Sequence, residues 1–450
     1  MNQRSHSLVQ GDIAHHMRAI GWPASVGMFF NTMYNVVDTL FAGFISTEAI
    51  AALSISFPLF FIILSFTQGL STGAAALISN ALGRGDEIST EKISAQVLVF
   101  AFFCYLAILA IGLTASQPLF QLLGASGAYL EMARAYMDVI FWGSLFFIFL
   151  YAANAILIAH GNSRTMRNYL VLGFFLNAAL DPWFLFGGFG LPAMGLAGIA
   201  LATVVTVFLG CCYILYTVTK SGFLRIVSWR DFIPHPPLLK ELAVQSFPAS
   251  LNMMTVGIGI FVIQYFLKPW GSSAMAAYGI CMRIEQIVLL PSIGLTVATL
   301  AIVGQNNGAH RFDRIRQTVR LACRYGFFLT LIGLLLIFVY PQPLIALFNN
   351  TPEVMDLGVT YLRIASLNSY AYILLGIFIS ALQGMKHPAF PFAIGLSRQI
   401  IVPFLLFPWA ASLGLLAIWW TIFGIVWTAA FATIMIFFWM IKRDENTRSG

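Results

Sequence analysis

Charged residues are scarce in this sequence. Asp, Glu, Lys and Arg make up 9% of its 450 residues, whereas soluble domains carry about 25%. A chain with so little charge cannot cover a water-facing surface, which excludes a soluble globular protein. Instead, 59% of the residues are hydrophobic, and they form long continuous runs. Because about 20 apolar residues span a bilayer and an alternating barrel pattern is absent, the runs predict an all-α polytopic membrane protein.

Motifs for nucleotide, metal and disulfide chemistry are also lacking. No G-x-x-x-x-G-K-[ST] motif occurs, and the seven histidines have no metal-like spacing. All five cysteines lie in or beside apolar segments, as small core residues do. We therefore expect no enzyme activity and no cofactor. A pump of this composition must draw its energy from an ion gradient, which indicates a secondary transporter.

Twelve apolar segments divide the chain into two halves. We predict an N-lobe (1–219, six helices), a cytoplasmic linker (220–241) rich in proline and arginine, and a C-lobe (242–450, six helices). The predicted transmembrane helices are 17–44, 50–81, 93–115, 130–159, 166–187, 193–219, 242–268, 274–305, 317–340, 354–383, 390–412 and 415–441.

The distribution of cationic residues fixes the expected orientation. Of the 24 Lys and Arg residues, all but Arg134, Lys268, Arg283 and Arg363 are predicted on one side of the membrane. The positive-inside rule makes that side the cytoplasm, with both termini there. The basic stretch 310–324 is then an anchor at a helix boundary, so we expect the lipid bilayer and not nucleic acid as its partner.

The two halves repeat each other at a constant offset of half the chain length, which adds 225 to a residue number. Pro23-Ala24-Ser25 aligns with Pro248-Ala249-Ser250, and Gly83 aligns with Gly308. Gln117-Pro118-Leu119 has its copy in Gln342-Pro343-Leu344. Since six helices are an even number, both halves insert the same way round. The expected fold is two six-helix lobes related by a pseudo-two-fold axis along the membrane normal, with a cavity between them.

Ionisable residues within membrane segments are costly, and the few here are functional candidates. Asp38, Asp138 and Asp181 all fall in the outer half of the N-lobe. Asn35 and Asp38 follow Asn31 by four and seven residues and so share one helical stripe with it. Their oxygens suit a hard cation such as Na⁺. Buried carboxyls close together also favour a bound proton.

A second pair has the same spacing. Asn177 precedes Asp181 by one helical turn, and Asn154 on the preceding helix offers another oxygen. Pro182 follows Asp181 and removes a helix hydrogen bond there, while Pro23 is expected to bend the first helix. The alternative to an ion site is a set of buried hydrogen bonds that only hold the helices together.

The C-lobe is poorer in acids. Arg283 and Glu285 are two residues apart and cannot face each other on a helix. Glu285 therefore needs another partner, for which Arg363 is the candidate. We expect this pair to be auxiliary or structural.

At this point the chain resembles the multidrug and toxic compound extrusion (MATE) transporters over nearly all its length. The resemblance rests on the two six-helix lobes and on four sequence features: Pro23 to Asp38, Gly83-Arg84-Gly85-Asp86, His160-Gly161-Asn162, and Asn177-x-x-x-Asp181-Pro182. The concentration of acids in the N-lobe resembles the DNA-damage-inducible (DinF-like) branch. Other branches place acids on helices 7 and 10, but the helix 7 stretch 252–255 has none.

The resemblance implies a function and a site. The family exchanges H⁺ or Na⁺ for cationic or amphipathic organic compounds by alternating access. By similarity, Asp38, Asn177 and Asp181 would bind the proton or cation, with Thr203 as the polar residue from helix 6. We expect a monomeric drug antiporter of a bacterial inner membrane. The alternatives are a lipid-linked precursor flippase of the same superfamily, and a membrane-embedded enzyme, for which no catalytic dyad is visible.

Overall fold

The computed structural model describes residues 8–188, 190–224 and 229–449. In these ranges the chain is helical and contains no β-strand, only an isolated bridge between Gly188 and Leu191. The long helices of the first half are α1 (Ile13–Gly43), α2 (Thr47–Gly83), α3 (Glu87–Leu122), α4 (Gly127–Ala159), α5 (Arg164–Phe186) and α6 (Leu196–Lys220). Those of the second half are α7 (Pro236–Leu267), α8 (Gly271–Gly308), α9 (Phe312–Val339), α11 (Pro352–Gly384), α12 (Ala389–Leu396), α13 (Val402–Leu413) and α14 (Leu415–Ser449). Short turns of helix lie at η1 (Trp229–Phe232), η2 (Lys268–Trp270) and α10 (Pro341–Ala346), and η3 (Ser397–Ile401) joins α12 to α13.

The membrane helices begin earlier or end later than hydropathy predicts, because polar caps add turns outside the apolar runs. Asp12 accepts hydrogen bonds from the backbone N–H groups of Ala14 and His15 and so starts α1. In the same way Asp86 caps α3, which begins at Glu87 and not at the predicted 93. Hydropathy does not detect these added turns, because they lie at the polar ends of the apolar runs.

Twelve spans are present in the described ranges when α12, η3 and α13 are counted as one. Ten segments there are long and apolar enough to cross a membrane, one of which, Pro236–Gly308, contains both α7 and α8. The remaining span is α1. Its polar residues Asn31, Asn35 and Asp38 lower its mean hydropathy. Polar residues within a membrane helix indicate a functional position.

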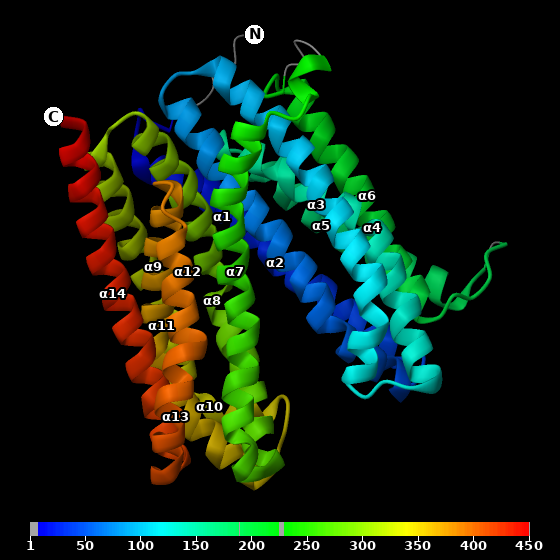
Figure 1. Cartoon of the computed structure of the whole chain (residues 1–450). Coiled ribbons are helices and arrows are strands. Elements are labelled where there is room, and N and C mark those ends of the chain that lie inside the picture. Colours follow the sequence, from blue (N-terminus) through cyan, green and yellow to red (C-terminus); the bar gives the residue numbers. More distant parts are fainter. Residues whose placement is uncertain (1–7, 189, 225–228, 450) are drawn as a thin grey trace.

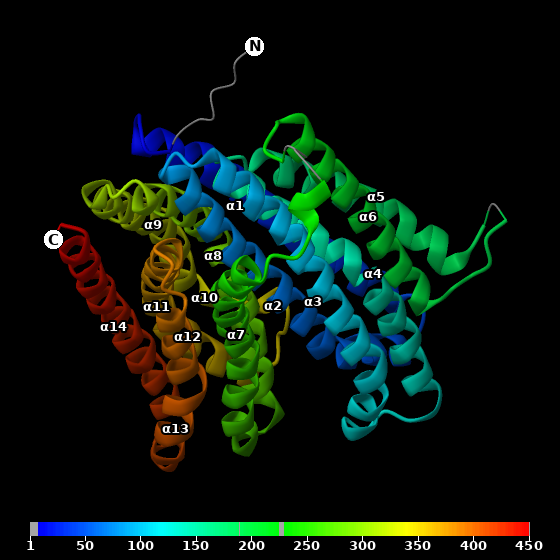
Figure 2. The same ribbon diagram turned by 45° about the horizontal axis from the view of Figure 1, so that its top comes forward.

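The helices form two bundles, each with its own core (Figures 1 and 2). We call α1–α6 the N-terminal bundle and α7–α14 the C-terminal bundle. One hydrophobic cluster fills the first and is built mainly from α2, α3, α4 and α6. Two further clusters fill the second, and one of them also includes Leu8, Met17 and Ile20 from α1 and the segment before it. The bundles touch where α2 packs against α7 and α8, and where α1 packs against α8.

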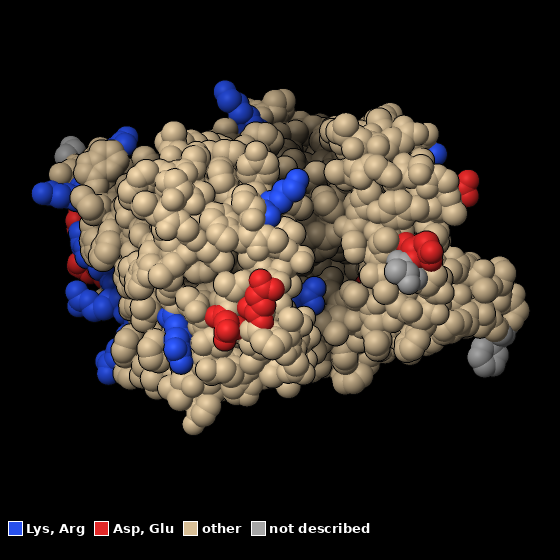
Figure 3. All heavy atoms as spheres, turned by 90° about the horizontal axis from the view of Figure 1, so that it is seen from below, with Lys and Arg blue, Asp and Glu red and all other residues tan. Residues whose placement is uncertain are grey.

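Both chain ends lie at the same end of the molecule, which we call the terminal end (Figure 1). The opposite end, called the open end, shows a hollow between the two bundles in a space-filling view (Figure 3). Few charged side chains surround this hollow.

One prediction about charge is wrong. Arg398 was counted among the residues at the cytoplasmic side, but it lies within η3, a π-helical turn inside the last-but-one span. Nine residues separate it from the start of α12 at Ala389, which corresponds to about 14 Å along the helix axis. That depth is close to the middle of a hydrocarbon core about 30 Å thick.

Candidate functional site

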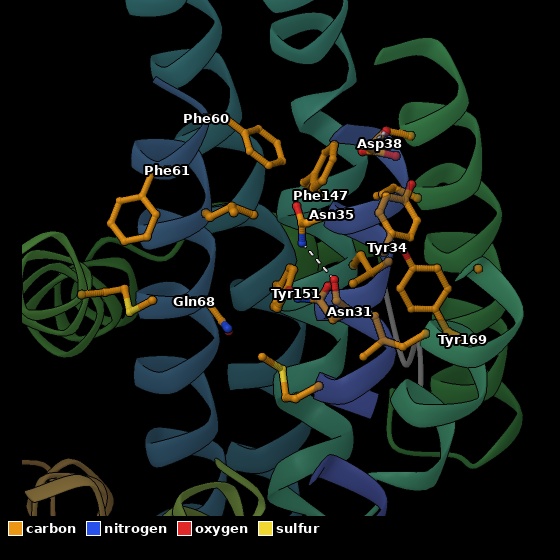
Figure 4. Close-up of a pocket in the computed structure, with 18 residues that line it drawn as sticks. Asn31, Tyr34, Asn35, Asp38, Phe60, Phe61, Gln68, Phe147, Tyr151 and Tyr169 are labelled. Carbon is orange, nitrogen blue, oxygen red and sulfur yellow. Dashed lines mark hydrogen bonds between the residues drawn. The ribbon is translucent and has the colours of Figure 1, made fainter. Parts of the chain in front are cut away.

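A cavity of about 170 Å³ lies in the N-terminal bundle. Helices α1, α2, α4, α5 and α6 supply all of its lining except Met253, which comes from α7. Figure 4 shows aromatic side chains on several sides of it, among them Phe60, Phe147 and Tyr169. The cavity is thus mostly apolar, with a few polar groups concentrated on one helix, the pattern typical of small-molecule sites.

That helix is α1, whose predicted polar stripe does face the cavity. Asn31, Asn35 and Asp38 all line it (Figure 4). The Asn35 side-chain amide donates a hydrogen bond to the Asn31 carbonyl oxygen at 2.9 Å. Tyr34, which sequence reasoning missed, also lines the cavity. Tyr34 precedes Asp38 by one helical turn, and this spacing could have predicted that it lies on the same face of α1.

Asp38 and Asp181 lie side by side, close enough to interact directly. Both are buried, at 8% and 0% exposure. The Thr203 hydroxyl donates to Asp38 Oδ2 at 3.3 Å. The Asn177 amide donates to Asp181 Oδ1 at 3.1 Å. The structure therefore brings together four residues that the sequence had placed on three different helices.

Unpartnered oxygens distinguish this cluster from a fully bonded structural network. Asp38 Oδ1, Asp181 Oδ2 and Asn177 Oδ1 are buried, and none has a hydrogen-bond partner among the described residues. Two adjacent buried carboxylates repel each other, and burial without a partner disfavours each charge. A proton shared by the pair, or a cation held by these oxygens, would satisfy them.

Two tyrosines complete the surroundings of the acids. Tyr34 lies beside Thr203 and Asp38. Tyr136 of α4 is close enough to both acids to interact with their charge. Tyrosine hydroxyls can donate to a carboxylate or accept from a protonated carboxyl. They therefore suit a site whose protonation changes during a cycle.

Other predicted residues are not brought to this cluster. Asn154 is buried but is not among the cavity residues. It stands five residues from the terminal end of α4, about 8 Å along the axis, whereas Asn177 stands about 20 Å from the terminal end of α5. Helix α4 contributes Phe147 and Tyr151 instead. Asp138 is half-buried and also lies outside the cavity lining.

The two prolines sit as predicted inside helices. Pro182 lies in α5 directly after Asp181, where it cannot donate a hydrogen bond to the carbonyl of Ala178. The carboxyl is therefore attached to a weakened turn. Pro23 is buried in α1 at the contact with α8, where the Ser25 hydroxyl donates to the Pro291 carbonyl at 2.7 Å.

The proposed pairing of Glu285 with Arg363 is wrong. Arg363 and Arg283 are both exposed, whereas Glu285 is buried with 8% exposure. Its hydrogen bond comes from the Tyr361 hydroxyl at 3.5 Å. No ion pair joins Glu285 to an arginine in the described part of the chain. The two-residue spacing on one helix had excluded Arg283 as a partner of Glu285. The spacing gave no information on Arg363, which belongs to another helix and has an exposed side chain.

Comparison with known families decides the classification. The model of the MatE family matches the chain twice, at residues 23–183 and 248–409. The chain belongs to the MatE family. The starts of the two matches differ by 248 − 23 = 225, the offset found within the sequence. MatE proteins are transporters, so this chain is a polytopic membrane transporter. Its assignment to the DinF-like branch stays a prediction.

Individual relatives agree with the family match. The chain is 28% identical to a protein named FAD transporter from Shewanella oneidensis, over 88% of each chain. It is 27% identical to the probable multidrug resistance protein YoeA of Bacillus subtilis, over 74% of this chain and 72% of that one. It is 25% identical to the probable multidrug resistance protein NorM of Thermotoga maritima, over 85% of this chain and 82% of that one.

Solved structures confirm the two-lobe fold. A multidrug resistance MATE family transporter in an outward-facing conformation superimposes with a TM-score of 0.90, at 22% identity over 99% of this chain and 100% of that one. A MATE structure in a bent conformation gives a TM-score of 0.91 and covers 100% of both chains at 22% identity.

Proposed function

We propose that this MatE transporter exports cationic or amphipathic organic compounds in exchange for H⁺, with Asp38 and Asp181 as the coupling carboxyls. The observation that carries the proposal is the side-by-side burial of these two acids, of which Asp38 lines a mostly apolar cavity. The names of two relatives as multidrug resistance proteins support the export of drugs. In this proposal the terminal end faces the cytoplasm of a bacterium, the protein works as a monomer in the inner membrane, and the lobes divide at 220–241.

The site geometry suggests the order of events. In the state open at the open end, a proton from outside binds the acid pair and removes the charge that attracted a cationic substrate. The substrate then leaves through the hollow. After the lobes close over the hollow and part at the terminal end, the proton departs to the cytoplasm and the next substrate enters. Asn177 and Thr203 donate to the ionised carboxyls in the deprotonated step, and Pro182 permits the local movement.

Sodium is the alternative coupling ion. The unpartnered oxygens of Asp38, Asp181 and Asn177 could serve as ligands for Na⁺, a hard cation that prefers oxygen. Burial of two adjacent carboxyls disfavours charge on both of them, which favours the proton.

A second candidate function follows from one relative. The similarity to the FAD transporter extends over 88% of each chain, more than the similarity to YoeA. Export of a flavin dinucleotide is therefore the rival substrate hypothesis. The lipid-linked precursor flippase hypothesis stays as the weaker alternative, because the lining of the cavity described above contains the acid Asp38 and no Lys or Arg.

The decisive experiment is transport in proteoliposomes with either ΔpH or ΔNa⁺ imposed alone. We expect ethidium transport to follow ΔpH in the wild type and to be abolished in Asp38→Asn and in Asp181→Asn. Asp138→Asn is the matched control, since Asp138 is a membrane acid outside the cavity, and it should keep transport. Transport driven by ΔNa⁺ alone would replace H⁺ by Na⁺. Undiminished ΔpH-driven transport in both Asp38→Asn and Asp181→Asn would overturn the proposal.

A further inference from the structure

The C-terminal bundle contains an acid and an arginine within its membrane helices that form no ion pair with each other in the described part of the chain. Glu285 belongs to α8 and Arg398 to η3. Tyr372 of α11 is close enough to interact electrostatically with each of them. The Arg398 guanidinium carbon lies 5.7 Å from the centre of the Tyr372 ring, over its face. Such a contact is favourable for a cation, but it leaves the guanidinium donors free.

Arg398 lacks an anionic partner. It makes no ion pair or hydrogen bond within the described residues, although surrounding protein removes much of its hydration. It is half-buried, so part of its surface is accessible. An unpaired arginine near mid-membrane is expensive and marks a functional position. Its location in a π-helical turn agrees with this, because such turns occur frequently at functional sites.

The internal repeat relates Glu285, Tyr372 and Arg398 to positions in the N-terminal bundle. In the N-terminal bundle, Phe60, Phe147 and Gly173 line the cavity. Adding the repeat offset of 225 to each gives Glu285 (60 + 225), Tyr372 (147 + 225) and Arg398 (173 + 225). Three cavity positions of one bundle therefore carry the acid, the tyrosine and the arginine of the other. Two apolar side chains and a glycine are replaced by charged and polar groups.

We propose that the C-terminal bundle carries a second substrate site, in which Arg398 binds the anionic group of an aromatic substrate and Tyr372 packs against its ring. The guanidinium offers several donors in a planar fork that matches a carboxylate, phosphate or sulfonate. The site would extend the substrates of the proposed exporter from cations to organic anions and zwitterions.

Binding measurements on the full-length protein in lipid nanodiscs test this site. The probes are naphthalene-2-sulfonate, a permanent aromatic anion, and ethidium, a permanent aromatic cation. We expect the wild type to bind both, and Arg398→Gln to weaken sulfonate binding about tenfold or more, as loss of a hydrogen bond to a charged group does. Ethidium binding should change less than twofold. Arg320→Gln, which removes an exposed arginine at the terminal end of α9, is the matched control and should bind like the wild type.

Two further variants keep the test decisive. Arg398→Lys preserves the charge but not the planar fork, and we expect intermediate sulfonate affinity. If Arg398→Gln does not fold, Arg398→Lys and Tyr372→Leu supply the result, since both should weaken sulfonate more than ethidium. Absence of sulfonate binding in the wild type, an unchanged affinity in the Arg398 variants, or an equal loss for both probes would each overturn the proposal.

This inference rests on the proposed transport function, but the two can fail separately. Asp38→Asn should abolish ΔpH-driven ethidium transport and leave sulfonate binding intact. Sulfonate binding that depends on Arg398 in a protein without proton coupling would contradict the antiport proposal alone. Normal proton coupling together with sulfonate binding that ignores Arg398 would contradict the second site alone.

Discussion

Asp38 and Asp181 receive their hydrogen bonds from different places. Asn177 is on the same helix as Asp181, one turn away, so that bond can persist when α5 moves as a unit. Thr203 belongs to α6, so its bond to Asp38 joins two helices. Protonation of Asp38 removes the charge that this hydroxyl donates to. A proton bound here therefore weakens the tie between α1 and α6, which gives protonation a structural consequence.

Two buried asparagines allow a matched test of the site. We expect Asn177→Leu to reduce ΔpH-driven transport about tenfold, because loss of a hydrogen bond to a carboxylate costs about 1.5–3 kcal/mol. Asn154→Leu makes the same chemical change at a buried asparagine that, unlike Asn177, donates no hydrogen bond to Asp181, and it should leave the transport rate within about twofold of wild type. Initial rates in proteoliposomes, normalised to the amount of reconstituted protein, measure both. Equal losses in the two variants would mean that the asparagines only support the fold.

At the residue scale, the sequence predicted which residues share one face of a helix better than it predicted where a single side chain lies in the bundle. The stripe Asn31, Asn35 and Asp38 was found because a fixed helical period puts these residues on one face. Asn177 with Asp181 was found in the same way. Asn154 was included because its side chain offers an oxygen, but its distance along the helix from the level of Asp181 was not considered. Arg398 was misplaced because hydropathy gives the bounds of a span but not the position of a charge along it.

The helices meet across the two bundles through a repeated small-residue contact. A Cβ atom on Gly69 of α2 would lie 2.3 Å from the backbone nitrogen of Ser250 in α7. A Cβ atom on Gly294 of α8 would lie 2.0 Å from the backbone oxygen of Gly21 and 2.3 Å from the hydroxyl of Ser25, both in α1. Gly69 and Gly294 are related by the repeat offset (294 − 69 = 225), as are Ser25 and Ser250. The same close approach is thus used twice.

Adding one methyl group at this contact should be costly. We expect Gly69→Ala and Gly294→Ala each to destabilise the protein by about 1–3 kcal/mol, the usual range for overpacking, because the obstructing atoms include backbone and cannot turn away. Gly279→Ala is the control, since a Cβ atom there meets nothing within 4 Å. Thermal unfolding in detergent measures the three variants. A midpoint unchanged in all of them would show that the two bundles are not held by this contact.

The last-but-one span shows where element prediction failed. The sequence predicted one continuous helix at 390–412, whereas the structure has α12, a π-helical turn and α13. The two family matches end at 183 and 409, a difference of 226, although their starts differ by 225. The two matched ranges thus differ by one residue in length, and the structure of the second contains a π-helical turn. Hydropathy cannot detect one inserted residue in an apolar run.

On the scale of the whole molecule, the terminal end is held shut by hydrogen bonds that also follow the repeat. The Asn80 amide of α2 donates to the Gly384 carbonyl at the end of α11, at 2.8 Å. The Gln305 amide of α8 donates to the Ala159 carbonyl at the end of α4, also at 2.8 Å. The repeat offset relates the two donors (305 − 80 = 225) and the two acceptors (384 − 159 = 225). Each bond joins one bundle to the other, so the closure has the two-fold symmetry of the chain.

Surrounding contacts reinforce this closure. The Leu8 backbone N–H donates to Gln305 Oε1 at 2.8 Å, so the segment before α1 is fastened to the C-terminal bundle. Within that bundle Arg316 pairs with Glu445. The guanidinium lowers the pKa of this carboxyl, which keeps the pair ionised at neutral pH. Opening of the terminal end must break the bonds between bundles, while the ion pair within one bundle can remain.

Removal of the symmetric bonds should therefore open the terminal end. We expect Asn80→Ala and Gln305→Ala each to increase the labelling of Ser79→Cys, a position with 0% exposure, by a membrane-impermeant maleimide applied to that side, in a background whose five cysteines are replaced. Because each bond contributes about 1 kcal/mol, each variant should label about fivefold faster. Gln96→Ala is the control, since that buried amide binds the linker through the carbonyls of Asp231 and Ile233. The double variant should label faster than either single one, because two bonds at opposite sides of a symmetry axis close the same gate independently. Slower labelling, or an effect of Gln96→Ala as large as the others, would contradict a gate held by this symmetric pair.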